Sequence, residues 1–448
     1  MADRLETLTK ALLHAARKAG ATAADAMAVD GTAISVDVRQ GRLEQAERAE
    51  GIEIGLRVLV GQRQACVSAS DISDRTIFDM AERAVAMARE APEDDSIGLA
   101  SPDQLARTRD ATALELSDPA ADPSAAALES DARRAEAAAL AVKGISQVDS
   151  ASASYARRRI HIAASNGFSG GYGRTSRSIS AVAITGDGLQ MERDWAAESR
   201  TFQSELPDAE AVGGLAAERT MARAGAKRPK TGACPVIFDE RVAASLIGHI
   251  LSATNGTAIV RGASWLRDAM GTQVLPKGLT ITEDPHRARI PGSRPFDAEG
   301  LATHARNIVE DGILTGWTLD LGTARRLGLA STASATRGPS APPSPGNSNI
   351  ALTPGPKTRD QLIADMGSGL LVTSFLGASI NPTTGDYSRG ASGFWVENGQ
   401  IAYPINECTV AGNLRDMLLR LTPANDARPH LSHLIPSLLV EGLTIAGQ

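Results

Sequence analysis

The chain has 448 residues, a formal net charge of −6 at pH 7, and aromatic side chains at only 3% of its positions. This length suffices for about two or three domains with their own cores. The net negative charge gives no general attraction to nucleic acid or to an anionic membrane. The scarcity of aromatic rings argues against a surface on which bases would stack. We therefore expect neither nucleic acid nor a membrane among the partners.

The cysteines and the N-terminal residues indicate the compartment. Cys66, Cys234 and Cys408 lie far apart in the sequence and form no CxxC pair. This favours a reducing compartment and argues against a disulfide framework or a cysteine-rich zinc site. The chain starts as a charged amphipathic segment without the apolar core of a signal peptide, and no apolar run approaches the ~20 residues that span a membrane. We expect a cytoplasmic protein.

The first 123 residues predict two helices and several strands. Leucines at helical spacing predict a helix over 4–19, and a second helix over 74–90 follows a cap at Ser73 or Asp74. The segments rich in β-formers are 33–38, 51–60 and 64–70, and the last two form a hairpin through Gly61. Residues 91–123 contain four prolines among acidic and small residues, which is typical of a long connection.

The rest of the chain divides into a central and a C-terminal part. An alanine-rich helix is predicted over 124–143, four strands over 148–202, and a further helix over 208–224. From Cys234 onward, glycines and prolines separate short apolar runs, which predicts mainly strands. Helices are expected there at 239–251 and 358–365.

These elements predict an α+β fold. We expect an N-terminal α/β-sandwich-like domain with long helices over 1–110. A central helix with an antiparallel meander would follow over 111–232, and a β-rich C-terminal domain over 233–448.

Four sequence blocks, in order over nearly the whole chain, resemble one protein family. The blocks are 38–46 with 51–58, the segment Pro291–Gly300 (PGSRPFDAEG), residues 314–320 with 324–328, and 388–399 with 405–414. Together they are similar to the TldD/TldE (PmbA) proteins. The resemblance implies a metallopeptidase family with two branches. In the TldD branch a helix carries HExxxH, and a cysteine near the C-terminus completes a zinc site. The TldE branch lacks these ligands and is the inactive partner in an assembly that trims or degrades peptides.

This chain departs from the zinc motif at several positions. When His249 is placed on the closing histidine of HExxxH, the first histidine falls on Ala244 and the glutamate on Ser245. No cysteine follows Cys408, which precedes the place of the ligand cysteine. The resemblance therefore implies no catalytic residue and no cofactor in this chain, with zinc held by a TldD-like partner. His249 also shares an apolar helical stripe with Leu246 and its neighbours, which favours a structural role.

Four other polar residues are candidates for a site. Asp297 and Glu299 form an acid pair that suits acid–base chemistry, but a loop network is favoured because no nucleophile or metal cluster accompanies them. Asn347 lies in the proline-rich loop 337–348, which is either a connector or a wall of a peptide chamber. Ser392 does not have the spacing of a GxSxG elbow. The peptide-chamber candidates are Asp297, Glu299, Asn347 and Ser392.

Three functional hypotheses remain. The first is a TldE-type subunit that pairs with a TldD-like catalytic subunit, or forms a homodimer when alone, and handles unfolded or small peptides. An open sheet edge in the β-rich C-terminal domain would receive the peptide as an added strand. The second is a self-sufficient metallopeptidase with a rearranged site built from His249 and His430, His433 or Cys408; these histidines are weak metal candidates. The third is a non-enzymatic binding protein or modulator that forms a homodimer.

Overall fold

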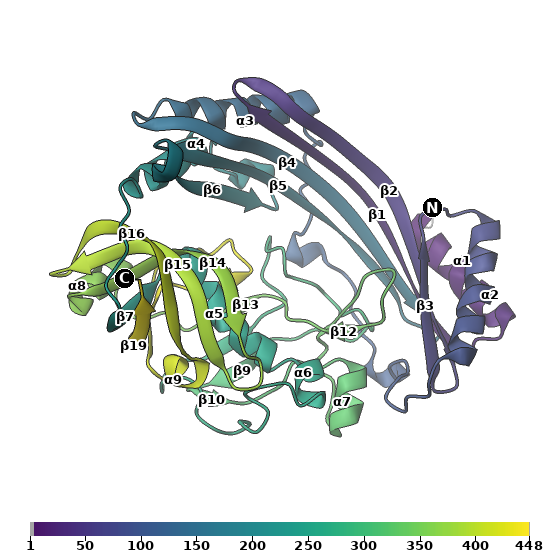
Figure 1. Cartoon of the computed structure of the whole chain (residues 1–448). Coiled ribbons are helices and arrows are strands. Elements are labelled where there is room, and N and C mark those ends of the chain that lie inside the picture. Colours follow the sequence, from purple (N-terminus) through teal and green to yellow (C-terminus); the bar gives the residue numbers. More distant parts are fainter. Residues whose placement is uncertain (1–3, 448) are drawn as a thin grey trace.

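The computed structural model describes residues 4–447. Its largest element is an antiparallel six-stranded sheet with the order β3-β2-β1-β4-β5-β6. This sheet arches over the C-terminal half of the chain (Figure 1). Its strands are β1 (Ala23–Arg39), β2 (Arg42–Val60), β3 (Arg63–Ala69), β4 (Ile145–Ala164), β5 (Ser169–Thr185) and β6 (Glu192–Arg200).

The hairpins of this sheet form where the sequence places turn residues. Gln40 and Gly41 both have positive φ, of 53° and 67°, and join β1 to β2 in a two-residue turn. The hairpin predicted through Gly61 is confirmed. Two expectations were wrong: the first strand extends well beyond 33–38, and 148–202 holds three strands rather than four. Gly170 and Gly171 in β5 form no turn, because they pair with Ile162 and His161 of β4, so the two strands run unbroken.

Four helices cover the convex face of the sheet (Figure 1). Those at one end are α1 (Arg4–Ala19) and α2 (Asp74–Glu90), and those at the other are α3 (Ala125–Leu140) and α4 (Ala209–Ala222). Ser73 is the cap of α2, because its side chain accepts from the backbone N–H of Thr76. Small residues let α3 and α4 approach closely: a Cβ atom on Gly213 would lie 2.0 Å from the carbonyl oxygen of Ala135.

A five-stranded barrel forms the C-terminal part of the chain. Strands follow the order β16-β15-β14-β7-β19, and pairing of β19 with β16 at Thr409–Ala411 closes the ring. β17 adds to the outside of β19, and α5 packs against β7 and β14. The elements are β7 (Gly232–Phe238), α5 (Glu240–Ala253), β14 (Gly369–Ile380), β15 (Asp386–Glu397), β16 (Gln400–Asn413), β17 (Leu421–Pro423) and β19 (Leu438–Ala446).

A second, smaller sheet lies beside the barrel, with the order β10-β9-β8-β13-β18. Its strands are β8 (Ile281–Glu283), β9 (Arg306–Glu310), β10 (Ile313–Leu314), β13 (Ile350–Leu352) and β18 (His433–Leu434). The remaining elements are α6 (Gly256–Val260), α7 (Leu321–Leu327), β11 (Ala335–Thr336), β12 (Ser344–Pro345), α8 (Arg359–Met366) and α9 (Leu414–Leu419). Single 3-10 turns cover Pro102–Gln104, Thr112–Leu114, Gly188–Gln190 and Gln203–Glu205.

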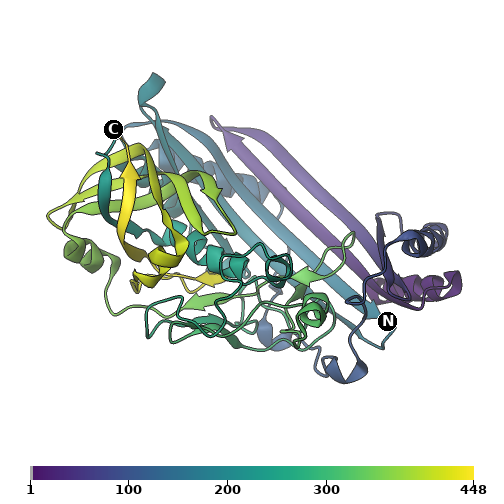
Figure 2. The same ribbon diagram turned by 60° about the horizontal axis from the view of Figure 1, so that its bottom comes forward.

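The arrangement confirms the α+β class. The barrel lies beneath one end of the arched sheet in Figure 1 and in front of that end in Figure 2, and α1 and α2 lie at the other end in both views. Within the barrel, β7 pairs with β14 only at Leu370–Val372, so residues 373–380 of β14 have a strand neighbour on one side only and offer an open edge for strand addition. β2 offers another, because β3 pairs only with Ile54–Val60 and leaves residues 42–53 without a neighbour on that side. None of the helices within 4–447 is long and apolar enough to cross a membrane.

Candidate functional site

The incomplete metal motif lies on α5, against the barrel. Leu246 and Ile250 are fully buried in the barrel core, as the apolar stripe predicts, whereas His249 is only partly buried. Ala244 and Ser245 are also partly buried, one turn before His249. Residues at i and i+4 lie on the same side of a helix, so Ser245 and His249 face the same surroundings.

His249 has no hydrogen-bonding partner at its Nε2 atom, although that atom is shielded from solvent. The edge of the imidazole meets the ring of Tyr387 on β15 at a centroid distance of 5.7 Å and an interplanar angle of 75°. Loss of hydration, followed by the nearby positive charge of Arg389, lowers the pKa of His249. The imidazole is therefore neutral near pH 7.

Arg389 from β15 brings a positive charge to this place. Its Nη1 atom lies 3.5 Å from the Oγ of Ser245, and its Nε–H donates to the carbonyl of Gly377 at 3.1 Å. The guanidinium carbon lies 4.1 Å from the ring centroid of Phe375, close enough for a cation–π contact. Among residues 4–447, no acidic side chain forms an ion pair with Arg389.

The side chains at this position do not fit the zinc site that the resemblance implies. Zinc in peptidases takes imidazole, carboxylate or thiolate donors and keeps one position open for water. Here His249 is the single imidazole, Ala244 offers no donor, and the Ser245 hydroxyl donates to the carbonyl of Val242 at 2.7 Å. A guanidinium also repels a cation. Within the described residues, no three His, Cys, Asp or Glu side chains gather as a metal would require.

The other weak metal candidates lie in different surroundings. His430 lies 3.3 Å from Glu198, between its Nε2 and a carboxylate oxygen, next to Arg428. His433 begins β18 and is exposed. Cys408 is buried, its thiol donates to the carbonyl of Ala391 at 3.2 Å, and burial raises its pKa to about 11, so it is not a thiolate.

Asp297 is buried where its loop turns between the sheet and the barrel. One carboxylate oxygen accepts from the backbone N–H groups of Glu299 and Leu301, both at 2.9 Å, and the other accepts from that of Ala335 at 3.1 Å. Burial raises the pKa of Asp297, while these three N–H groups oppose the rise. The carboxylate thus joins its own loop, at Glu299 and Leu301, to the segment that contains Ala335.

Glu299 faces the end of the arched sheet. It accepts from the backbone N–H of Leu321, the first residue of α7, at 2.9 Å. Its side chain lines a small enclosed pocket together with Asp25 and Arg57, which form a buried ion pair at 2.5 Å. Burial, the charge of Asp297 and that of Asp320 raise the pKa of Glu299 to about 8. A carboxyl that holds its proton near neutral pH can donate as well as accept hydrogen bonds.

Loop 337–348 reaches the same end of the sheet. Arg337 has a fully buried side chain and forms an ion pair with Asp25. The backbone of Pro339 passes so close to Gly55 on β2 that a Cβ atom there would lie 2.1 Å from the Pro339 carbonyl oxygen. The loop is therefore anchored against the sheet, and Gly55 provides the space it needs.

Ser392 lies on β15, whereas Asn347 follows β12, which pairs with β11 at Ala335. The Asn347 side chain donates to the hydroxyl of Thr318 at 2.9 Å. Ser392, on β15, accepts from the guanidinium of Arg223 at 2.7 Å, next to the end of α4. Of the four peptide-chamber candidates, Asp297 and Glu299 share one loop. Asn347 lies two residues after Pro345, which pairs with the same Ala335 that donates to Asp297. Sequence reasoning missed Arg389, although it falls inside the fourth family-like block.

The concave face of the arched sheet carries small polar side chains. The residues Ala151, Ala153, Ile179 and Ala181 face α3 and α4 in a buried core, so the residues between them face the other way. Those residues are Ser152, Ser154, Ser178 and Ser180, and all are partly exposed. The hydroxyls of Ser154 and Ser178 lie 2.6 Å apart across the strand pair.

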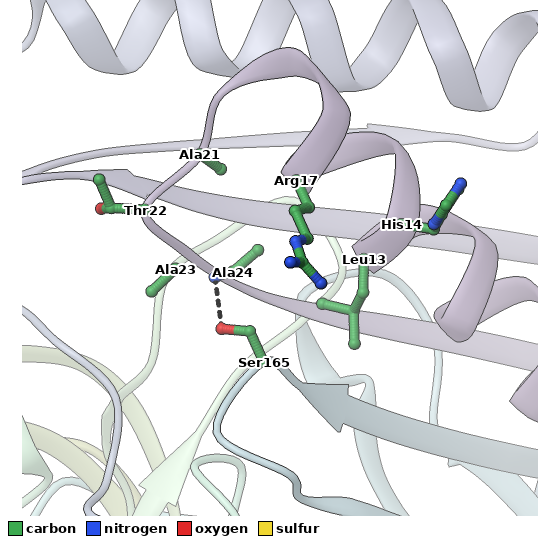
Figure 3. Close-up of a pocket in the computed structure, with 8 residues that line it drawn as sticks. All are labelled: Leu13, His14, Arg17, Ala21, Thr22, Ala23, Ala24 and Ser165. Atoms are coloured by element: carbon green, nitrogen blue, oxygen red, sulfur yellow. Dashed lines mark hydrogen bonds between the residues drawn. The ribbon is translucent and has the colours of Figure 1, made fainter.

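A separate open pocket, with a volume of about 460 Å³, lies near α1 at the same end of the sheet as Asp25 (Figure 3). Arg17 and Leu13 from α1 face Ala24 and Ser165, whose hydroxyl accepts from the Ala24 backbone N–H at 3.0 Å. The full lining is Leu13, His14, Arg17, Ala21, Thr22, Ala23, Ala24 and Ser165. None of the residues predicted as a site lies in it.

An arched sheet above a β-barrel, with an incomplete metal motif on the barrel's helix, defines a metallopeptidase-like architecture. Three family models match in order: PmbA/TldA metallopeptidase domain 1 over 24–88, the central domain over 118–224, and the C-terminal domain over 231–447. The chain belongs to the PmbA/TldD metallopeptidase family, as the four sequence blocks predicted.

Relatives and solved structures agree with this assignment. Metalloprotease PmbA of Escherichia coli O157:H7 is 37% identical over 93% of this chain and 90% of its own length. A PmbA homologue of Haemophilus influenzae is also 37% identical, over 96% of this chain and 94% of its own. A Bacteroides thetaiotaomicron protein named as a modulator of DNA gyrase superposes with a TM-score of 0.92 at 27% identity, covering 100% of this chain and 99% of that one. TldE from Thermococcus kodakarensis gives 0.86 at 18% identity over 98% and 100% of the two chains, which shows a shared fold.

Proposed function

We propose that this chain is a TldE/PmbA-type subunit without a metal of its own, which works with a TldD-like zinc peptidase on unfolded or small peptides. The observation that carries the proposal is the set of side chains around His249. A zinc peptidase needs a metal-bound water and a carboxylate to accept its proton. This place instead holds Ala244, Ser245 and the guanidinium of Arg389.

The arched sheet supports a role in peptide handling. Its concave face presents serine hydroxyls such as Ser154 and Ser178, which can exchange hydrogen bonds with an extended peptide of any sequence. The anchored loop 337–348 fixes the end of the sheet relative to the C-terminal half. Such a surface would line one wall of a chamber, and the catalytic subunit would supply the other.

The experiment that tests this function uses the chain with and without a TldD-like chain that has an intact HExxxH motif. We expect a stable complex by size-exclusion chromatography, and hydrolysis of an unfolded peptide only when both chains are present. Zinc should be found with the TldD-like chain. If the two chains do not associate, or if hydrolysis by the TldD-like chain is the same without this chain, the proposed role is wrong.

The name metalloprotease, carried by relatives at 37% identity, favours a second candidate, a peptidase that acts alone. It predicts near-stoichiometric metal in the purified chain, lost together with peptide hydrolysis in His249→Ala. The first candidate predicts neither result. Metal analysis of the chain purified alone therefore separates the two.

A further inference from the structure

We infer that the place of the incomplete motif is a binding site for a carboxylate group, held by Arg389 and His249. The site lies between α5 and β15, and its aromatic wall is formed by Phe375 and Tyr387. The assignment of this carboxylate to a peptide rests on the proposed function. The inference that the site binds a carboxylate is independent of the proposed function.

The first observation is an uncompensated charge. The neighbours of the Arg389 guanidinium are a backbone carbonyl, a hydroxyl and an aromatic ring, which are all neutral. A partly buried charge without a counter-ion is unfavourable, and most buried cations in proteins are paired. Some inward-facing arginines of this chain pair with an acid, as Arg57 does with Asp25 and Arg241 with Asp194. Arg294 instead donates to two backbone carbonyls. An anionic ligand would give Arg389 the charged partner that Arg57 and Arg241 have.

The second observation is independent of that charge. The Nε2 atom of His249 is buried and has no partner, although a buried polar atom without a hydrogen bond costs about 1–3 kcal/mol. His249 lies one helical turn from Ser245, whose hydroxyl is next to Arg389. The unpaired cation therefore lies close to the imidazole, whose pKa its charge lowers, and Tyr387 on β15 contacts the same imidazole.

The chemistry of the two groups selects a carboxylate. A guanidinium presents parallel N–H donors whose spacing matches the two oxygens of a carboxylate. A neutral imidazole with its proton on Nε2 adds one further donor, without a second full charge. The rings of Phe375 and Tyr387 would pack against an apolar residue next to the carboxylate. A peptide C-terminus and an aspartate or glutamate side chain both offer this group.

The test follows the ring nitrogens of His249 by NMR in the chain labelled with ¹⁵N-histidine and kept without a partner. His249→Gln assigns the signals. Acetate is the first probe. Tetra-alanine with a free C-terminus is the second, tetra-alanine amide the third, and an acetylated, amidated peptide with one internal glutamate the fourth. We expect saturable shifts of the His249 signals with acetate and tetra-alanine, and none with the amide. A response to the fourth probe would assign the site to acidic side chains as well.

Arg389→Gln should abolish the saturable response, or weaken it at least tenfold. The matched control is Arg415→Gln, which removes an exposed cation of the same half of the chain that lies over the ring of Trp265 at 6.0 Å. This control should bind as the parent chain does, and both variants should keep the parent melting temperature within a few degrees. Shifts that do not saturate, or that persist in Arg389→Gln, would overturn the inference. Neither result depends on whether a TldD-like chain associates, so the two proposals fail separately.

Discussion

Arg389 lies with its Nη1 atom 3.5 Å from the hydroxyl of Ser245, the residue that occupies the position of the motif's glutamate. The two residues are 144 positions apart in the sequence. The family resemblance implies a carboxylate at this position, next to a metal ion. This chain holds a hydroxyl there, next to a fixed positive charge.

Metal removal should leave this chain unaffected. We expect the purified chain to contain well under a tenth of an equivalent of zinc, because one imidazole beside a guanidinium does not form a zinc site. Prolonged treatment with a chelator should leave the melting temperature unchanged in scanning calorimetry. A metalloprotein whose metal couples to folding would melt at a lower temperature after the treatment.

Restoring the two lost side chains on α5 should not restore the metal site. In the double variant Ala244→His with Ser245→Glu, a third ligand is still missing and Arg389 still repels the cation. We expect zinc content to stay below a tenth of an equivalent by atomic absorption. Adding Arg389→Gln to the double variant tests how much the positive charge of Arg389 opposes zinc binding. Zinc bound stoichiometrically by the double variant would show that the guanidinium is no obstacle.

Glu299→Gln should change how stability depends on pH. Because the pKa of Glu299 is raised from 4.5 to about 8, the folded chain keeps a proton that the unfolded chain loses at lower pH. Glu299 thus contributes stability below pH 4.5, and this contribution falls as the pH rises toward 8, by at most about 1.4 kcal/mol per pH unit. Glutamine remains neutral, so the variant should lose less stability between pH 5 and 8. Urea unfolding at several pH values measures this, with exposed Glu218→Gln as the control.

Arg337→Gln should destabilise the chain strongly. Its buried guanidinium is the link between loop 337–348 and Asp25, and breaking a buried ion pair costs about 3–5 kcal/mol. The control is Arg48→Gln, which breaks an exposed ion pair with Glu50 that contributes about 0–1 kcal/mol. The urea concentration at the midpoint of unfolding, measured for Arg337→Gln and Arg48→Gln, compares the two losses of stability. Equal shifts would mean that the loop is not anchored by this pair.

Two adjacent glycines of α4 offer a matched pair of variants. Gly213→Ala places a methyl group 2.0 Å from the carbonyl oxygen of Ala135, so α3 and α4 must separate, at a cost of about 1–3 kcal/mol. Gly214→Ala meets nothing within 4 Å and should stabilise the helix by up to about 1 kcal/mol. The melting temperature should therefore fall in Gly213→Ala and rise in Gly214→Ala. If both variants lose stability, close helix contact is not the reason for Gly213.

The sequence by itself determined the local elements and the loss of the motif. Leucine spacing set α1, the cap at Ser73 set the start of α2, and glycine turns set the hairpins, because these depend on residues close together in the chain. It also determined that Ala244 and Ser245 stand where ligands are needed, since that requires only the order of residues. Strand lengths were less certain, because alternating small residues carry a weak periodic signal.

Only the tertiary structure decided what replaces the lost ligands. Arg389, Phe375 and Tyr387 reach α5 because β14 and β15 pair in one barrel, whose closure depends on contacts between residues far apart in the sequence. The pairing of Arg337 with Asp25 has the same origin, across 312 positions. Burial sets the charge state of Glu299 and leaves His249 without a partner, and burial is a property of packing. The residue order shows which chemistry was lost, and the packing shows which charges and donors now occupy its place.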